Sequence, residues 1–304
     1  MARPELCVIF NPAAGKHRGR QRLEQIRHTW GSDVAFRPTS HPGHAIELAE
    51  SAAREGISVV AAAGGDGTAH EVLNGLMRVR NPDVAFSIIP IGSANDYAFS
   101  LGLDPNQPPE PRNVDVGCVL LPNEKQVFFG CCLGTGFNGR VTLESRKIHR
   151  LQGIALYGLA AIRSLMYHYV YPPLSIQIDD QPKQVLPTLM FSALVGKREG
   201  GFTLAPLAQM DDGLLDYVHA EDLTRWQILQ FLPRLALFGP PTSYPKLRQG
   251  QCRRIVLRSE TPLVAHADGE LMCLPEHPVH ELEITIAPAA LRVVALGGRS
   301  RQRG

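Results

Sequence analysis

The sequence has little net charge, and its cysteines show no pattern typical of a metal site or of a disulfide-stabilised fold. Its formal net charge at pH 7 is +2, which is too small to favour nucleic acid as the main partner. The six cysteines include no C-x-x-C pair, so the sequence predicts neither a zinc site nor a disulfide framework. A reducing cytoplasm is therefore the expected location.

The sequence also lacks a clear membrane span. Residues 151–170 are nearly all apolar, but Arg163 lies among them, and an arginine near the middle of a span costs about 2.5–3.5 kcal/mol. We therefore expect a buried helix of a soluble domain at this position. Residues 1–10 enter a strand-like run at once and do not have the shape of a signal peptide.

Two common nucleotide-binding motifs are absent or incomplete. Gly15 and Lys16 are followed by a histidine, so the chain has no Walker P-loop. Residues 134–139 match G-x-G-x-x-G, but the acidic residue that a dinucleotide fold places about 20 positions later is missing. These features argue against a Walker P-loop enzyme and against a Rossmann dinucleotide site.

What is present suits a globular protein of two domains or one large one. The chain has 304 residues, of which 44% are hydrophobic and 20% charged. In its first third, strand-like runs end at Phe10, Phe36, Ala63 and Ile89, with helical patterns between them. This alternation predicts an open, mainly parallel α/β sheet. Ligands bind such sheets at the carboxyl ends of the strands, so we expect the turns after these strands to form one site.

The central turn is Gly-Gly-Asp-Gly-Thr at residues 64–68, after a buried strand at residues 57–63 and before a helix with an apolar stripe. Backbone N–H groups at such a helix start attract an anion, and glycine lets a ligand approach the backbone closely. Asp66 would repel a phosphate unless a cation such as Mg²⁺ lay between them. The alternative is an ordinary connection in which Asp66 and Thr68 are only turn and N-cap residues.

Residues 104–112 contain four prolines and predict a linker. Beyond it, strand-like runs joined by turns such as Asp-Asp-Gln-Pro at residues 179–182 predict an antiparallel β-sandwich. The predicted strands there are residues 114–121, 127–133, 174–178, 188–195, 254–258, 263–267 and 282–286. We predict a nucleotide-binding α/β domain over residues 1–113, to which a strand at 290–297 returns, a β-sandwich domain over residues 114–289 and a flexible tail at 298–304.

Several motifs occur along the chain in the order expected for one family. They are Asn-Pro-x-x-Gly at residues 11–15, Gly-Gly-Asp-Gly-Thr at 64–68, Pro-x-Gly-Ser-Ala-Asn-Asp at 90–96, Asp-Val-Gly at 115–117, Gly-Thr-Gly-Phe-Asn at 134–138, Gly-Phe-x-x-Ala-Pro at 201–206, Asp-Asp-Gly-Leu-Leu-Asp at 211–216 and Asp-Gly-Glu at 268–270. This series spans nearly the whole chain and resembles the catalytic domain of the diacylglycerol kinase family, which includes soluble bacterial lipid kinases. The glycine turn alone also resembles that of NAD kinases.

The resemblance implies an α/β domain of the NAD kinase and diacylglycerol kinase type, followed by the sandwich, with ATP bound between them. It also implies that the last strand, residues 291–296, returns to the first domain. The residues that it places at the nucleotide are Asn11, Gly15, Thr39, Gly64, Gly65, Asp66, Gly67, Thr68, Gly92, Ser93 and Asn95. Ser93 stands where the family usually has threonine, which keeps a hydroxyl. Asn138 stands where the family often has aspartate, which leaves an electrostatic role at that position open.

The resemblance assigns the proton transfer to Glu270. This carboxylate becomes the candidate base that takes the proton of the attacking hydroxyl. The residues before it, Asp268 and Gly269, taken alone predict a solvated hairpin turn.

Magnesium has candidate ligands at two places. Asp66 is the first candidate to organise Mg²⁺ with the ATP phosphates, and Asp96 and Asp115 rank behind it. For a second, structural Mg²⁺ the resemblance implies Asp212 together with the backbone carbonyls of Gln209 and Leu214. An Asp-Asp-Gly turn that binds nothing is the alternative.

A lipid substrate has to be reached at a surface. Residues 225–238 carry Trp226, Phe238 and two arginines and suggest an interfacial amphipathic segment. Pro233 interrupts this segment, and core packing is the competing interpretation.

We therefore expect an ATP- and Mg²⁺-dependent lipid kinase that phosphorylates a hydroxyl of diacylglycerol or a related glycerolipid. The alternatives are an NAD kinase-like phosphotransferase and a nucleotide-binding regulator without catalytic activity. The expected partners are a diacylglycerol-like lipid and, transiently, a membrane surface, with a homodimer left open and no nucleic acid. The expected location is cytoplasmic, peripheral to the membrane while the lipid is bound.

Overall fold

The computed structural model describes residues 5–12, 16–103, 110–122 and 124–296. Gly15, most of the predicted linker and the predicted tail lie outside the described residues. The chain divides into two compact units, which we call unit 1 (Met1–Val114 and Ala289–Gly304) and unit 2 (Asp115–Pro288). That these units fold as separate domains with the predicted boundaries stays a prediction.

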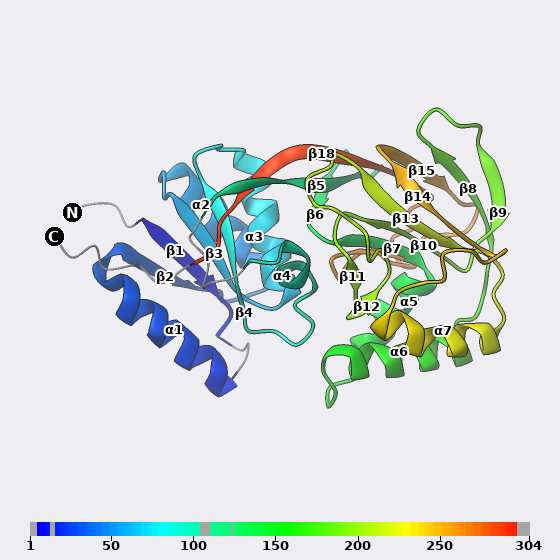
Figure 1. Ribbon diagram of the computed structural model, residues 1–304, viewed down its shortest axis with the longest axis horizontal. Coiled ribbons are helices and arrows are strands. Elements are labelled where there is room, and N and C mark those ends of the chain that lie inside the picture. The colour runs from blue at the N-terminus through cyan, green and yellow to red at the C-terminus, as the bar shows by residue number, and fades with distance from the viewer. Residues whose placement is uncertain (1–4, 13–15, 104–109, 123, 297–304) are drawn as a thin grey trace. The chain divides into compact units, whose positions relative to one another are not determined.

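Unit 1 is built on a parallel sheet. Its strands are β1 (Leu6–Phe10), β2 (Val34–Pro38), β3 (Val59–Gly64) and β4 (Ala85–Pro90), in the order β2-β1-β3-β4. All three strand pairs are parallel, and the end of β18 joins β4 through Val293 opposite Phe86. Figure 1 shows these strands in blue to cyan, with β18 in red. Their carboxyl ends therefore meet at one edge of the sheet.

Helices cover this sheet, and they bury the apolar residues on both of its faces. The helices are α1 (Lys16–Trp30), the short 3₁₀ helix η1 (Gly31–Asp33), α2 (His44–Arg54), α3 (Asp66–Val79) and α4 (Asp96–Leu101). Leu23 and Ile26 of α1 pack against a cluster of alternate strand residues that includes Leu6 and Val8. Helices α2 and α3 pack against each other and against β1 and β3. The alternation of helix and strand in the sequence is thus realised as layers around a parallel sheet.

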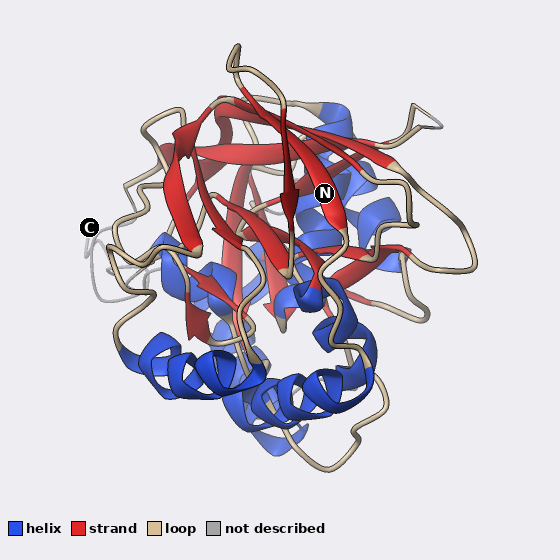
Figure 2. Cartoon of the chain, turned by 90° about the vertical axis from the view of Figure 1, so that its right-hand side faces the viewer, coloured by secondary structure: helices blue, strands red, loops and turns tan. Residues whose placement is uncertain are grey.

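Unit 2 is an antiparallel β-sandwich with helices at one side. One sheet has the order β14-β13-β10-β7-β16-β17, and the other contains β18-β15-β8-β9, with β5 paired to β18 and to β6. The strands are β5 (Arg112–Leu120), β6 (Gln126–Phe129), β7 (Cys132–Gly136), β8 (Pro173–Ile178), β9 (Gln184–Pro187), β10 (Met190–Leu194), β11 (Arg198–Glu199), β12 (Phe202–Thr203), β13 (Leu215–Ala220), β14 (Leu247–Cys252), β15 (Arg254–Arg258), β16 (Ala265–Ala267), β17 (Glu270–Cys273) and β18 (Glu281–Val293). Figure 2 shows the strands of unit 2 in red above helices in blue.

The helices of unit 2 are α5 (Phe137–Ser145), α6 (Gly153–Tyr167) and α7 (Arg225–Leu237). Helix α6 corrects the expectation of a buried helix: Ala160, Ala161 and Leu165 are buried, whereas Ile162 and Met166 are 44% and 63% exposed. None of the described helices is long and apolar enough to cross a membrane.

Helix α7 also differs from the sequence-based expectation. It starts at a capping box, in which Thr224 and Gln227 satisfy each other's backbone N–H groups. Pro233 lies inside the helix without ending it. Trp226 and Phe238 are 75% and 70% exposed, so the interpretation that they pack in the core is wrong for these two side chains.

The strand predictions need two further corrections. Residues 127–133 form two strands, β6 and β7, because the chain turns at Gly130 and Cys131. Residues 282–286 and 291–296 were expected as two strands, but a single strand, β18, covers residues 281–293. Ala289 has a φ of 50° within it, so the chain kinks there and pairs with β15 before the kink and with β4 after it.

Candidate active site

The turns at the edge of the unit 1 sheet are joined by backbone hydrogen bonds. The amide of Asn11 donates to the carbonyl of Ala63 at 3.3 Å, and the amide of Thr39 donates to the carbonyl of Phe10 at 2.9 Å. On the other side, the amide of Gly92 donates to the carbonyl of Gly64 at 3.1 Å. The turns after β1, β2, β3 and β4 therefore form one continuous surface at the carboxyl edge of the sheet.

Two glycines are needed for the closest approaches at this edge. A Cβ atom on Gly64 would lie 2.3 Å from Oγ1 of Thr68, and one on Gly92 would lie 2.3 Å from Cα of Gly65. Neither position tolerates a side chain unless the backbone moves. The glycine turn and the turn after β4 are thus in direct backbone contact.

Asp66 lies at this contact, as the first residue of α3. Its Oδ1 accepts a hydrogen bond from the amide of Tyr97 at 3.2 Å, which joins the start of α3 to the start of α4. Asn95 has a φ of 53°, and its Nδ2 donates to the carbonyl of Gly92 at 2.8 Å, which fixes the turn after β4. Asp96, the first residue of α4, is buried. The first N–H groups of α3 have no partner within the helix and present a positive end to an anion.

The structure brings together most of the residues predicted to contact the nucleotide. Those at the carboxyl edge of the unit 1 sheet are Asn11, Thr39, Gly64, Gly65, Asp66, Gly67, Thr68, Gly92, Ser93 and Asn95. Gly15 lies outside the described residues. Glu270, Asp115 and the residues predicted for the second metal belong to unit 2.

In unit 2, Glu270 follows a two-residue hairpin turn. Asp268 and Gly269 connect β16 to β17 with φ values of 50° and 83°, and Ala267 pairs with Glu270. Positive φ at both central residues is the conformation that tight hairpins prefer, and Asp-Gly is well suited to it. The Glu270 side chain is 42% exposed, and Nη2 of Arg146 donates to its Oε2 at 2.6 Å. The candidate base is therefore presented at a hairpin tip, with a cation that orients one of its oxygens.

Asp268 anchors this hairpin to the neighbouring strand. Its carboxylate accepts hydrogen bonds from the amides of Gly130, Cys131 and Cys132 at 2.9, 2.8 and 3.0 Å. The side chain is buried, so these N–H donors replace the water that a charged carboxylate requires. The Asp268 side chain is thus committed to holding the turn, which leaves Glu270 as the accessible carboxylate of the motif.

The acidic turn before β13 holds the residues predicted for the second metal. Asp212 accepts hydrogen bonds from the amide of Leu214 at 3.0 Å and from Nε2 of Gln251 at 3.3 Å, and buried Asp115 accepts one from the amide of Gly213 at 2.7 Å. Burial raises the pKa of the nearby Asp216, Gln251 opposes this effect and Asp212 adds to it.

The donor set of this turn fits a hard cation in kind, because it offers carboxylates and backbone carbonyls. However, no cluster of three or more His, Cys, Asp or Glu side chains that could hold a metal occurs among the described residues. Occupation by Mg²⁺ through Gln209, Asp212 and Leu214 stays a prediction.

The sequence did not identify two buried polar residues behind the hairpin, His266 and Glu199. Nε2 of His266 lies 3.0 Å from Oε1 of Glu199, and Nδ1 of His266 accepts from the amide of Gly269 at 3.2 Å. The detectable signal was a histidine between two alanines in a short buried strand, two residues before Asp268. Its partner is distant in the sequence and could not be found from local pattern.

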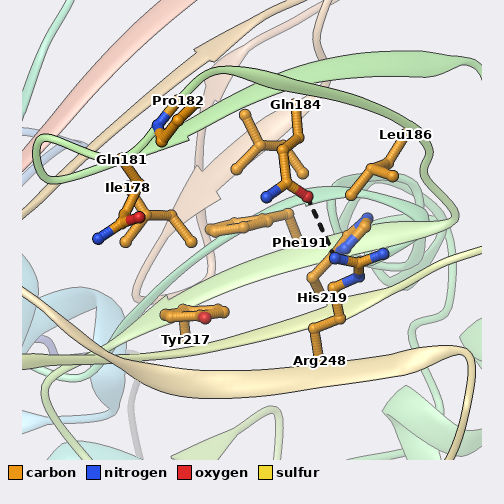
Figure 3. Close-up of a pocket in the computed structure, with 10 residues that line it drawn as sticks. Ile178, Gln181, Pro182, Gln184, Leu186, Phe191, Tyr217, His219 and Arg248 are labelled. Carbon is orange, nitrogen blue, oxygen red and sulfur yellow. Dashed lines mark hydrogen bonds between the residues drawn. The ribbon is translucent and has the colours of Figure 1, made fainter.

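Unit 2 also contains a pocket of about 150 Å³. Figure 3 shows its lining from β8, β9, β10, β13, β14 and the turn between β8 and β9. Phe191 and Tyr217 stack there with ring centroids 6.0 Å apart. Arg248 donates to Gln184 at 3.1 Å and to Glu221 at 2.7 Å, and burial lowers the pKa of His219 to about 4. Since Arg248 is paired and His219 is neutral at pH 7, the pocket offers no unpaired charge for a substrate.

Comparison with known proteins places this geometry in a family. Residues 5–117 match the model of the diacylglycerol kinase catalytic domain, and residues 131–295 match that of the YegS C-terminal NAD kinase beta sandwich-like domain. A probable lipid kinase YegS-like of Chromohalobacter salexigens is 31% identical over 294 residues, which cover 92% of this chain and 89% of that protein. The chain belongs to the diacylglycerol kinase catalytic-domain family. The resemblance predicted from the ordered motifs is thereby confirmed.

Other known proteins match most of the chain at lower sequence identity. A diacylglycerol kinase of Mycobacterium tuberculosis is 26% identical, with coverage of 95% of this chain and 94% of that protein. A crystal structure of a diacylglycerol kinase from Bacillus anthracis superimposes with a TM-score of 0.70 at 18% identity, covering 97% of this chain and 98% of that chain. Yeast NADH kinase gives a TM-score of 0.52 at 9% identity. The predicted fold class, an α/β part followed by an antiparallel β-sandwich, is confirmed.

Proposed function

We propose that this protein is an ATP- and Mg²⁺-dependent lipid kinase that phosphorylates a hydroxyl of diacylglycerol or a related glycerolipid. Membership of the family supports a lipid kinase in general. The observation that carries the finer proposal is the position of Glu270 in unit 2, at a hairpin tip beside a helix whose exposed face is apolar. A Cβ atom on Gly269 would lie 3.4 Å from the hydroxyl of Tyr157, in the first part of α6.

The nucleotide belongs at the carboxyl edge of the unit 1 sheet. The amides at the start of α3 suit the phosphates of ATP. The missing side chains of Gly64 and Gly92 allow the close contacts with Thr68 and Gly65 that hold this turn in place. Asp66 would hold Mg²⁺ at this edge, and the bound cation would supply the positive charge that offsets the repulsion between carboxylate and phosphate. The role of Asp66 is to keep that charge at the site.

The Glu270 carboxylate would act on the acceptor lipid. The hydroxyl oxygen forms a bond to the γ-phosphorus while the bond to the leaving ADP oxygen breaks, and the hydroxyl proton passes to Glu270. Arg146 contacts the same carboxylate, so it orients Glu270 for this transfer. The product would be a phosphorylated lipid and ADP.

The lipid would be reached through an apolar face on α6 and α7, which we call the docking face. It consists of the exposed side chains Ile154, Leu159, Ile162, Met166, Trp226, Leu229, Leu237 and Phe238. The two helices lie side by side, joined through buried Ala161, Leu165 and Ile228 (Figures 1 and 2). Exposed Leu, Ile and Trp side chains together with an exposed arginine, here Arg234, are typical of a helix that lies in the membrane interface.

The docking face begins beside the candidate base. Ile154 opens the exposed stripe of α6, and Tyr157, one turn later, lies against Gly269. A lipid that enters from a bilayer in contact with α6 would therefore arrive near Glu270. This arrangement favours a lipid over NAD as the acceptor, because a dinucleotide does not need an exposed apolar face.

Transfer of labelled phosphate from ATP to a panel of lipids in mixed micelles tests the proposal, with NAD as a parallel acceptor. We expect label on a diacylglycerol-type lipid. Glu270→Gln should lower kcat by at least about 100-fold, the usual contribution of a general base, while ATP still binds. Asp66→Ala should abolish transfer.

Glu276→Gln is the matched control, because it makes the same change at an exposed carboxylate shortly after β17 and should leave kcat unchanged. Label on NAD would support the NAD kinase-like alternative. ATP binding without label on any acceptor would support the non-catalytic regulator.

A further inference from the structure

A continuous set of buried polar side chains lies behind the hairpin that carries Glu270. His266 is 2% exposed, Glu199 is 8% exposed and Ser192 is fully buried. Oε2 of Glu199 accepts a hydrogen bond from Oγ of Ser192 at 2.7 Å, and Ser192 accepts one from Nδ2 of Asn138, also at 2.7 Å. These residues come from β16, β11, β10 and α5, and they end at the amide of Gly269.

The contacts fix the protonation of the imidazole. The Gly269 amide donates to Nδ1 of His266 at 3.2 Å, so Nδ1 carries a lone pair and not a proton. The proton of the neutral ring is therefore on Nε2, which donates to Glu199 at 3.0 Å. Asn138 fixes the direction of the next hydrogen bond. Its side-chain amide donates to the Ser192 hydroxyl oxygen, and the hydroxyl proton of Ser192 then donates to Glu199. An aspartate at position 138 would remove that first donor.

Space for this pair is built into the sheet. A Cβ atom on Gly134 would lie 2.5 Å from Oε1 of Glu199 and 2.6 Å from Nε2 of His266. The glycine pattern at residues 134–139 thus makes room for the buried pair, and Gly139 in turn allows α5 to approach Val264. Burial of a carboxylate is costly unless hydrogen bonds compensate for the lost water, and Ser192 and His266 supply those bonds to Glu199.

We propose that Glu199 and His266 are positioning residues for Glu270. Glu199 holds His266 in one tautomer, and Nδ1 of His266 then holds the amide of Gly269, the residue directly before Glu270. Asp268 holds the same turn from the other side through the amides of residues 130–132. The two anchors fix the direction in which the Glu270 carboxylate points. This inference rests on the proposed role of Glu270 as the base.

Two substitutions of His266 separate its two hydrogen bonds. His266→Asn places an amide oxygen near the position of Nδ1 and keeps an acceptor for Gly269. His266→Gln reaches the position of Nε2, keeps the contact to Glu199 and loses the acceptor for Gly269. We expect His266→Gln to lower kcat by about 100-fold, as misplacement of a reacting group does, with KM for ATP and lipid changed by less than about 3-fold. His266→Asn should recover most of that loss.

Two further variants, Glu199→Gln and a control at His219, complete the experiment. Glu199→Gln preserves shape but removes the charge that selects the tautomer, and we expect kcat to fall by about 10-fold, as when the partner of an oriented histidine is lost. His219→Asn is the matched control: His219 is also a buried histidine of unit 2, but its Nε2 contacts Thr188 and not the hairpin. It should lower stability without lowering kcat.

Hydrogen exchange at the Gly269 amide gives a readout that does not require kinase activity. We expect faster exchange in His266→Gln than in His266→Asn or the wild type, and a ¹⁵N signal of a neutral ring protonated on Nε2 in the wild type. Equal exchange at Gly269 in the two His266 variants would overturn the inference. So would equal losses of kcat in the His266 and His219 variants. A wild type that phosphorylates no lipid would overturn the proposed function alone, because the exchange result would still show whether His266 holds the turn.

Discussion

His219 is held as a neutral imidazole inside unit 2. It is 1% exposed, contacts Oγ1 of Thr188 at 3.0 Å and lies beside the ring of Phe191. Burial, the largest influence on this group, lowers its pKa from 6.5 to about 4. The unfolded chain would therefore take up a proton at a pH at which the folded chain does not.

This difference predicts a dependence of stability on pH. Because the folded pKa lies below the unfolded one, the contribution of His219 is fully present above pH 6.5 and is lost as pH falls towards 4. The loss amounts to about 3 kcal/mol over that range. Urea unfolding at pH 7 and pH 4.5 should show a smaller decrease in His219→Gln than in the wild type. The same decrease in both proteins would contradict the assignment, and His277→Gln, at an exposed position, serves as the control.

The residues of the candidate site differ in how far the sequence could predict them. Asp66 and Gly92 lie in turns that local composition identifies, and the structure places those turns in backbone contact. Glu270 is predicted only through the family motif, because Asp268 and Gly269 alone predict only a hairpin. Glu199 and His266 could not be predicted, since their contact depends on how β11 and β16 meet in the fold.

At the scale of elements, the packing of α2 on α3 depends on one glycine. A Cβ atom on Gly75 would lie 2.4 Å from the carbonyl oxygen of Ile46 and 2.7 Å from Cβ of Ala49. Helix propensity alone favours alanine over glycine by up to about 1 kcal/mol. The close approach of the two helices opposes this preference, because an added methyl group would push them apart.

We therefore expect Gly75→Ala to lower the free energy of unfolding by about 1–3 kcal/mol, the usual cost of overpacking. Gly158→Ala in α6 is the matched change in open space, since no atom lies within 4 Å of its added Cβ. It should raise stability by up to about 1 kcal/mol. Denaturant unfolding of the two variants tests both signs. A stabilised Gly75→Ala would show that α2 and α3 can separate at little cost.

Sequence pattern predicted elements well where short apolar runs end in glycine-rich turns and less well where tertiary contacts decide. The strands of unit 1 follow from continuous apolar runs such as residues 6–10 and 59–63, and the turns after them follow from their composition. The sequence pattern does not predict the short helix α5, because Gly136 directly precedes it and Gly139 lies within it; these glycines allow close contacts with Leu189 and Val264. Pro233 was expected to interrupt α7, but this exposed residue costs the helix only one hydrogen bond on its solvent side.

For the whole molecule, the order of motifs was more informative than any single motif. The glycine turn alone also resembles that of NAD kinases, and the fold is similar too, as the match to yeast NADH kinase indicates. The resemblance to the lipid kinase family depends on the whole ordered series, which includes the Asp-Gly-Glu hairpin and the other motifs of unit 2. The sequence could not predict the exposed apolar surface of α6 next to that hairpin. The exposed and the buried positions of this helix carry the same types of apolar residue, so the sequence does not tell them apart.

The docking face gives the last prediction. Ile162→Glu with Trp226→Glu places two charges on exposed positions, so the fold should be retained. Each buried apolar side chain contributes about 1.5–3 kcal/mol, so binding to phosphatidylcholine vesicles should weaken by at least about 10-fold. Binding should persist in 0.5 M NaCl, since burial of apolar surface drives it. The substitutions should spare transfer to a short-chain lipid below its micellar concentration.

Val185→Glu controls for charge, because Val185 is 61% exposed on β9 of the same unit and lies outside the docking face. Vesicle sedimentation and sedimentation equilibrium without lipid are measured on all three proteins. Unchanged vesicle binding in the double variant would contradict membrane docking. A wild-type dimer that the double variant dissociates, with no vesicle binding by either protein, would assign the face to a second copy of the chain instead.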